Sequence, residues 1–109
     1  MLRALAVAAI VSLFGAASAA AQGTPTQGEK VYAAQKCGLC HAIDGKGNLK
    51  GPLDEAVGKL SAADIRAWIT DANAMTAKTK ATRKPDMKSY TLPADELDAV
   101  VAYMMSLKK

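Results

Sequence analysis

The chain has 109 residues, 50% of them hydrophobic, and a formal net charge of +4 at pH 7. This length suits one small domain, and so slight a basic excess is unlike the charge of a nucleic-acid-binding arm. The chain contains two cysteines and one histidine, too few for a structural zinc site built from those ligands. We therefore expect neither a nucleic-acid partner nor structural zinc.

Residues 1–21 have the pattern of a secretory signal peptide. Arg3 gives a short positive start, an apolar stretch runs to Phe14, and small residues lead to Ala21. An uncleaved membrane anchor is the alternative, but this stretch is alanine-rich and short for a span of about 20 residues. We predict cleavage after Ala21. The mature chain, residues 22–109, is then expected in the periplasm without stable membrane insertion, because the leader looks prokaryotic.

The mature chain is predicted to begin with a helix. Thr26 and Glu29 have the spacing of a capping box, so we expect the helix to run from about Gln27 to Lys36. This helix would deliver the chain directly into the next motif.

That motif is Cys37-Gly38-Leu39-Cys40-His41, or C-x-x-C-H, the spacing typical of c-type haem attachment. Each thiol can form a thioether with one vinyl group of the porphyrin. The histidine follows directly, so its ring can serve as the proximal ligand of the iron. The motif predicts one covalently bound haem c and its iron.

Three other interpretations of the motif are open. A thioredoxin-like redox pair would lie near a βαβ pattern, and the chain has no strand-like alternation. A disulfide between Cys37 and Cys40 would close a very small loop and stabilise little. His41 could also be an ordinary surface histidine.

Composition favours the haem. Without Phe14 the mature chain has four aromatic residues for 88 positions: Tyr32, Trp68, Tyr90 and Tyr103. A core this small gives only marginal stability without a disulfide, a metal or a cofactor, and a flat apolar macrocycle could form its centre.

The rest of the chain is predicted to alternate loops and helices. Residues 42–52 are a loop with turn chemistry, and residues 53–57 a short helical turn. Ser61 and Asp64 form a second capping box for a helix over 62–72, in which Ile65, Trp68 and Ile69 make one apolar stripe. Residues 75–87 are polar and basic, and the last helix should run from residue 93 or 94 to 107.

A methionine is the expected second axial ligand, because a thioether opposite histidine raises the reduction potential of a haem. Met104 and Met105 lie inside the last helix, where Met104 fits the apolar stripe. Met87 follows a proline in a loop that could cover the haem face opposite His41. We predict Met87 as the ligand, with Met75 as the next candidate.

Taken together, these residues resemble a class I c-type cytochrome over residues 22–109. The resemblance implies an all-α, small cytochrome c fold, with roughly three to five helices wrapped around one covalent haem. It also implies that the first and last helices cross, with Gly28 and Tyr32 facing Val100 and Tyr103. By the same resemblance, the Pro52 carbonyl accepts a hydrogen bond from His41, and Trp68 lines the haem edge.

The function that this resemblance implies is electron transfer through the haem by a periplasmic carrier, not an enzyme. We expect a monomer whose redox partner proteins have acidic docking surfaces, steered by Lys78, Lys80, Lys84 and Lys88. Two alternatives are a haem-bearing subunit of a larger respiratory complex and a ligand-binding haem protein with an open sixth site.

Overall fold

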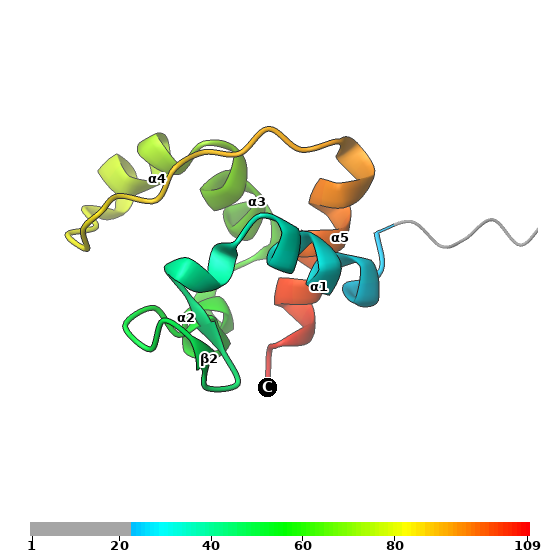
Figure 1. Ribbon diagram of the computed structural model, residues 1–109. Helices are drawn as coiled ribbons and strands as arrows, with labels where there is room; N and C mark the ends of the chain where they lie inside the picture. Colours follow the sequence, from blue (N-terminus) through cyan, green and yellow to red (C-terminus); the bar gives the residue numbers. More distant parts are fainter. Residues whose placement is uncertain (1–22) are drawn as a thin grey trace, which may run out of the picture.

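The computed structural model describes residues 23–109, so the predicted leader, residues 1–21, lies outside the described part. The described chain is mostly helical, which confirms the predicted all-α class (Figure 1). No helix within residues 23–109 is long and apolar enough to cross a membrane. In chain order the elements are α1 (Pro25–Ala34), η1 (Cys37–Leu39), β1 (Ala42–Ile43), β2 (Lys46–Gly47), α2 (Leu53–Ala56), η2 (Val57–Lys59), α3 (Ala62–Thr70), α4 (Ala72–Thr79) and α5 (Ala94–Ser106).

Helix α1 begins two residues before the predicted start. Its N-cap is Thr24, whose hydroxyl accepts a hydrogen bond from the Gln27 amide at 3.2 Å. Pro25 then occupies the first helical position, where its fixed φ suits a helix and its missing N–H costs nothing. The capping box predicted at Thr26 was wrong because this earlier site combines a cap with a favourable proline.

The first and last helices lie against each other, as expected (Figure 1). Gly28 is buried at their contact, where a built Cβ would lie 2.6 Å from Cβ of Tyr103 and overlap the carbonyl oxygen of Ala99. One turn further on, the rings of Tyr32 and Tyr103 meet edge to face with centroids 5.9 Å apart. The absence of a side chain at Gly28 is therefore what allows the two backbones to approach.

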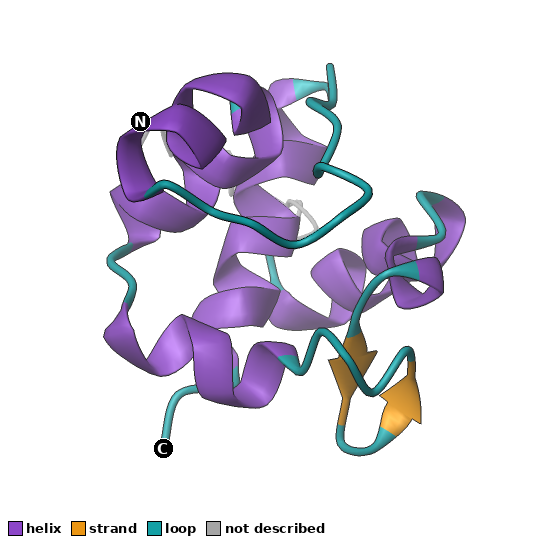
Figure 2. Ribbon diagram, turned by 90° about the vertical axis from the view of Figure 1, so that its left-hand side faces the viewer, coloured by secondary structure: helices purple, strands orange, loops and turns teal. Residues whose placement is uncertain are grey.

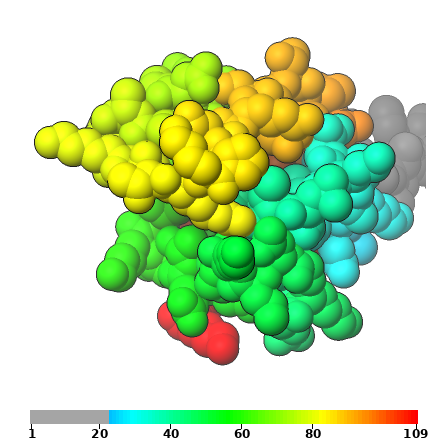
Figure 3. All heavy atoms as spheres, turned by 60° about the vertical axis from the view of Figure 1, so that its left-hand side comes forward, coloured from blue at the N-terminus to red at the C-terminus, as the bar shows by residue number. Residues whose placement is uncertain are grey.

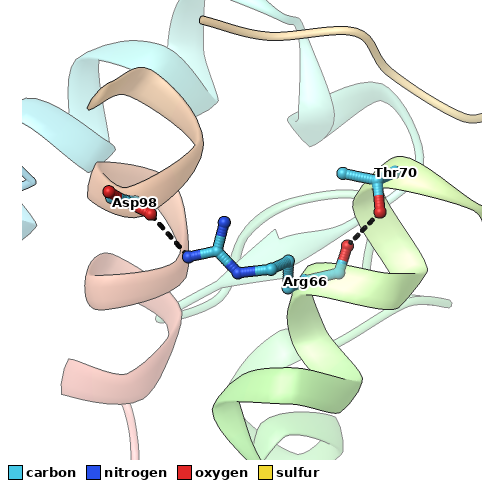
Figure 4. Close-up of polar contacts among 3 residues, drawn as sticks. All are labelled: Arg66, Thr70 and Asp98. Atoms are coloured by element: carbon cyan, nitrogen blue, oxygen red, sulfur yellow. Dashed lines mark hydrogen bonds and ion pairs between the residues drawn. The ribbon is translucent and has the colours of Figure 1, made fainter. Parts of the chain in front are cut away.

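Helix α3 begins at the predicted capping box. The Ser61 hydroxyl accepts from the Asp64 amide at 3.1 Å, and the Asp64 carboxylate accepts from the Ser61 amide at 3.1 Å. Further along α3, Arg66 reaches Asp98 of α5 at 2.5 Å (Figure 4). Both side chains of this pair are about half exposed, so it contributes little to stability.

Two elements were not predicted. Asp71 ends α3 in a non-helical conformation, and its side chain accepts from the Ala74 amide at 3.4 Å. A separate helix, α4, therefore begins at Ala72, where the predicted helix was expected to end, and continues into the polar, basic stretch. Within the loop predicted for residues 42–52, Ile43 pairs with Lys46 in a two-residue hairpin, drawn as the small arrows of Figure 2. Asp44 and Gly45 both have positive φ, which is the Asp-Gly turn that favours such hairpins.

The core of the described chain consists of aliphatic side chains and one methionine. The buried cluster is Val31, Ile43, Val57, Ile65, Val100, Val101 and Met104. The tyrosines at positions 32 and 103 pack against it while partly exposed. Burial of Met104 agrees with its predicted packing role.

We predict that Gly28→Ala lowers the free energy of unfolding by about 1–3 kcal/mol, because the added methyl group would force α1 away from α5. Gly58→Ala is the matched control: a Cβ there meets no atom within 4 Å, and the change should stay within about 0.5 kcal/mol. Denaturant unfolding midpoints measure both. Equal midpoints for the two variants would contradict the close crossing.

Candidate functional site

The C-x-x-C-H motif forms one tight turn directly after α1. Lys36 adopts a left-handed conformation, with φ of 56°, and turns the chain out of the helix. The amides of Cys40 and His41 both donate to the Cys37 carbonyl, at 3.1 and 2.9 Å. Cys37 is half-buried and Cys40 exposed, and both are free thiols, so the disulfide alternative finds no support. Burial raises the pKa of the Cys37 thiol.

The imidazole of His41 has a fixed orientation. Its Nδ1 lies 3.2 Å from the carbonyl oxygen of Gly51. A carbonyl can only accept, so Nδ1 carries the hydrogen and the lone pair of a neutral ring is on Nε2. Burial lowers the pKa of His41 below its usual value, which favours this neutral form. His41 therefore offers one nitrogen suited to bind a metal.

The prediction that Pro52 supplies this acceptor was wrong by one residue. Pro52 is the N-cap of α2, and its carbonyl accepts from the Ala56 amide at 3.3 Å. The Gly51 carbonyl accepts from the Ala42 amide at 3.0 Å as well as from His41. Helix α2 thus engages the proline carbonyl and leaves the glycine carbonyl to orient the histidine.

Tyr32 supports the same turn from α1. Its hydroxyl lies 3.5 Å from the carbonyl oxygen of His41, at the long limit for a hydrogen bond. Burial, with a smaller contribution from Cys37, raises the pKa of Tyr32 to about 12, so the hydroxyl keeps its proton at neutral pH. The helix crossing and the attachment turn are therefore in direct contact.

A hollow of about 600 Å³ opens beside His41. Its lining includes three cationic side chains and one carboxylate, and comprises His41, Lys50, Gly51, Pro52, Leu53, Glu55, Ala56, Lys59 and Arg83. In Figure 3 the yellow segment near residue 80 lies against the teal and green loops that carry the motif and the Gly51 region. Arg83 makes this contact by donating to the Cys40 carbonyl at 2.6 Å.

A second, apolar hollow of about 30 Å³ borders the attachment turn at Cys37. It is lined by Val31, Gln35, Cys37, Ile69, Met87, Tyr90, Leu92 and Val100. Met87 is half-buried there and lies outside the helices, as predicted, whereas the rival Met75 is buried inside α4. The Met87 thioether therefore forms part of the same apolar wall as Cys37.

The structure brings the predicted site residues together in two groups. His41 and Pro52 line the larger hollow, while Cys37 and Met87 line the smaller one. Trp68 lies half-buried on α3 and lines neither hollow. Cys40, too, lines neither hollow. The role of Trp68 at the haem edge stays a prediction, as do the haem-binding roles of Cys37, Cys40, His41 and Met87.

Sequence reasoning missed two residues of this site. Gly51 was seen only as part of a loop, because a Gly-Pro dipeptide indicates a turn without indicating which carbonyl faces the histidine. Arg83 was seen only as part of the polar, basic stretch over residues 75–87, and nothing in its local sequence indicates a contact with the distant Cys40.

These groups fit a covalently held haem. The turn supplies two thiols, His41 supplies a free nitrogen, and the adjoining hollows supply space with an apolar side. Within residues 23–109 no cluster of three or more His, Cys, Asp or Glu side chains offers another metal site. Fold and site together define a small c-type haem protein.

Comparison with known proteins agrees. The family model described as Cytochrome c matches residues 25–108, and the chain belongs to this family. Its fold is accordingly the small cytochrome c fold, and its cofactor is covalently attached haem c with iron.

The chain also resembles cytochrome c oxidase subunit 2 of Alkalihalophilus pseudofirmus, with 30% identity over 91 residues. The match includes 75% of this chain but 25% of that protein, so the chain spans about a quarter of the length of this curated relative. No solved structure matches.

We predict that protein from cells competent for cytochrome maturation carries one haem that stays attached after denaturation. Cys37→Ala/Cys40→Ala should lose it completely, while each single variant should keep one thioether. Mass spectrometry of the denatured protein measures the added haem. If the protein with both cysteines has the mass of the polypeptide alone, without an added haem, the assignment is contradicted.

Proposed function

We propose that the chain is a periplasmic one-electron carrier in which His41 and Met87 are the axial ligands of the haem iron. Membership of the cytochrome c family supports haem-based electron transfer. The haem supplies a reversible one-electron change at its iron. The observation that carries the proposal is the contact of His41 Nδ1 with the Gly51 carbonyl, which leaves Nε2 to bind iron, together with the Met87 side chain in the hollow that Cys37 also lines.

The protein's own residues then orient and insulate the cofactor. Gly51 fixes the ring of His41 and makes it more electron-donating, and Met87 supplies a soft sulfur from an apolar wall. His41 is the chain's only histidine, so no second imidazole is available as a distal acid or base. Both features favour transfer of an electron without making or breaking bonds, hence a carrier and not an enzyme.

Export is part of this proposal. The leader pattern in residues 1–21 supports delivery to the periplasm, where haem c proteins of this kind would meet their redox partners.

A second candidate is a role inside a larger respiratory complex. The similarity to a protein named cytochrome c oxidase subunit 2 supports it. In that role the same haem would pass electrons to another centre of the complex. Co-purification from cells at native expression separates a stable subunit from a free carrier.

The basic segment that leads to Met87 supports docking to acidic partners. Lys78, Lys80, Lys84 and Lys88 are all exposed. Two of them make local contacts: Lys84 pairs with Asp86 at 2.7 Å, and the Lys88 ammonium lies 5.0 Å from the ring centre of Tyr90. Lys78 and Lys80 make no ion pair within the described residues, so their charge is available to steer a partner.

We predict that Met87→Ala lowers the reduction potential and changes the visible spectrum, because a thioether ligand raises the potential of haem. Met75→Leu, a volume-conserving change inside α4, should keep both. Spectra and redox titrations of the purified haem proteins provide the measurement. An unchanged spectrum for Met87→Ala would favour the alternative with an open sixth site.

We predict that electron transfer with an acidic redox partner slows as ionic strength rises, since salt screens charges beyond a Debye length of about 10 Å at 0.1 M. Lys78→Gln/Lys80→Gln should slow the reaction at low salt and flatten its salt dependence. Lys30→Gln on α1 is the control and should behave as the unmodified protein. Stopped-flow rates across a salt series provide the measurement, and a rate independent of salt would remove the steering role.

A further inference from the structure

We propose that Arg83 is a positioning residue that fastens the Met87 segment to the haem-attachment turn and so controls how often the Met87 sulfur leaves the iron. The inference rests on the proposed axial role of Met87 and adds the element that holds this ligand in place.

The contact itself joins two distant parts of the chain. The Arg83 guanidinium donates to the carbonyl oxygen of Cys40, 43 positions earlier, at 2.6 Å. A charged donor makes this bond stronger than one between neutral groups. Figure 3 shows the yellow segment that contains Arg83 packed against the teal segment that contains Cys40.

Gly51 makes room for that guanidinium. A Cβ built on Gly51 would overlap both the guanidinium of Arg83 and the carbonyl oxygen of Cys40. Arg83 thus occupies a notch formed where a side chain is missing. The same Gly51 orients His41 through its carbonyl, so the fastening lies beside the proximal ligand.

The Met87 segment depends on this contact because, within residues 23–109, its first part makes no other long-range hydrogen bond. Every residue from 80 to 86 is exposed, so no core packing fixes them. The amides of Lys80 and Ala81 bond only to α4 next to them, and the Lys84–Asp86 pair is local.

The part of the segment after Met87 has its own anchors. The Tyr90 amide donates to the Ile69 carbonyl at 2.7 Å, and the Ser89 hydroxyl accepts from the Ala72 amide at 2.9 Å. Met87 therefore lies between two differently anchored parts of the chain. The residues after it are held by the hydrogen bonds of Ser89 and Tyr90, whereas the long-range hydrogen bond of the residues before it, among the described residues, comes from Arg83. Removing that bond should free the ligand on one side.

The test measures imidazole binding to the ferric, haem-loaded protein. Imidazole can replace the Met87 sulfur only after that sulfur dissociates, so the rate at saturating imidazole reports the dissociation. We expect Arg83→Gln to raise this limiting rate about tenfold, the weaker end of what a hydrogen bond to a charged group supplies.

Two further variants separate positioning from general stability. Arg83→Lys keeps the charge but lacks the planar fork, and should give an intermediate rate. Arg66→Gln removes the exposed pair with Asp98 in Figure 4, and should leave the rate unchanged. Denaturant unfolding of each variant is measured beside the kinetics. A positioning role predicts that Arg83→Gln raises the limiting rate by a larger factor than it lowers the equilibrium constant for folding.

The outcomes are distinct. If the limiting rate of Arg83→Gln at saturating imidazole is within twofold of the rate of the original protein, the positioning role of Arg83 is overturned and the axial role of Met87 is not. A visible spectrum of the ferric protein that Met87→Ala leaves unchanged means that the Met87 sulfur is not a ligand of the iron, and overturns both this inference and the axial assignment of Met87.

Discussion

The burial of apolar surface is the constraint on which this molecule depends. Within residues 23–109 the buried hydrophobic side chains are valines, isoleucines, alanines and two methionines, and Val57 is the largest that is fully enclosed. A domain of this size is marginal even with a good core. The covalently attached haem c of this family adds a flat apolar surface that the polypeptide can pack against, and its covalent bonds keep it in place. Folding of this chain is therefore coupled to attachment of its cofactor.

The helix crossing and the haem turn are mechanically linked. Gly28 lets α1 and α5 approach, and Tyr32, one turn further, contacts both Tyr103 and the backbone of His41. Helix α1 ends three residues before Cys37, and the left-handed Lys36 turns the chain into the motif. A shift in the crossing would therefore move the thiols and the imidazole together. The helix pair therefore helps to hold the predicted haem-binding residues in place.

Local signals could be predicted from the sequence, and distant contacts could not. The Ser61–Asp64 capping box and the last helix follow from spacing alone and are confirmed. Helix α4 was missed because Asp71 both ends one helix and begins another. The carbonyl that orients His41 was predicted to be that of Pro52, because a family resemblance locates such a contact only to within a residue or so. In the structure the Pro52 carbonyl caps helix α2, and the Gly51 carbonyl contacts His41 instead. The bond from Arg83 to Cys40 spans 43 positions and leaves no periodic trace in the sequence.

The pairing of α1 with α5 also orders events during biosynthesis. A ribosome completes α1 and the cysteines long before it reaches α5, so the nascent chain exposes its thiols while the partner helix does not yet exist. Pairing between such distant segments is slow, since the intervening loop must first close. Until α5 pairs with α1, the thiols of Cys37 and Cys40 lie in an open peptide, and that form of the chain favours attachment of the porphyrin.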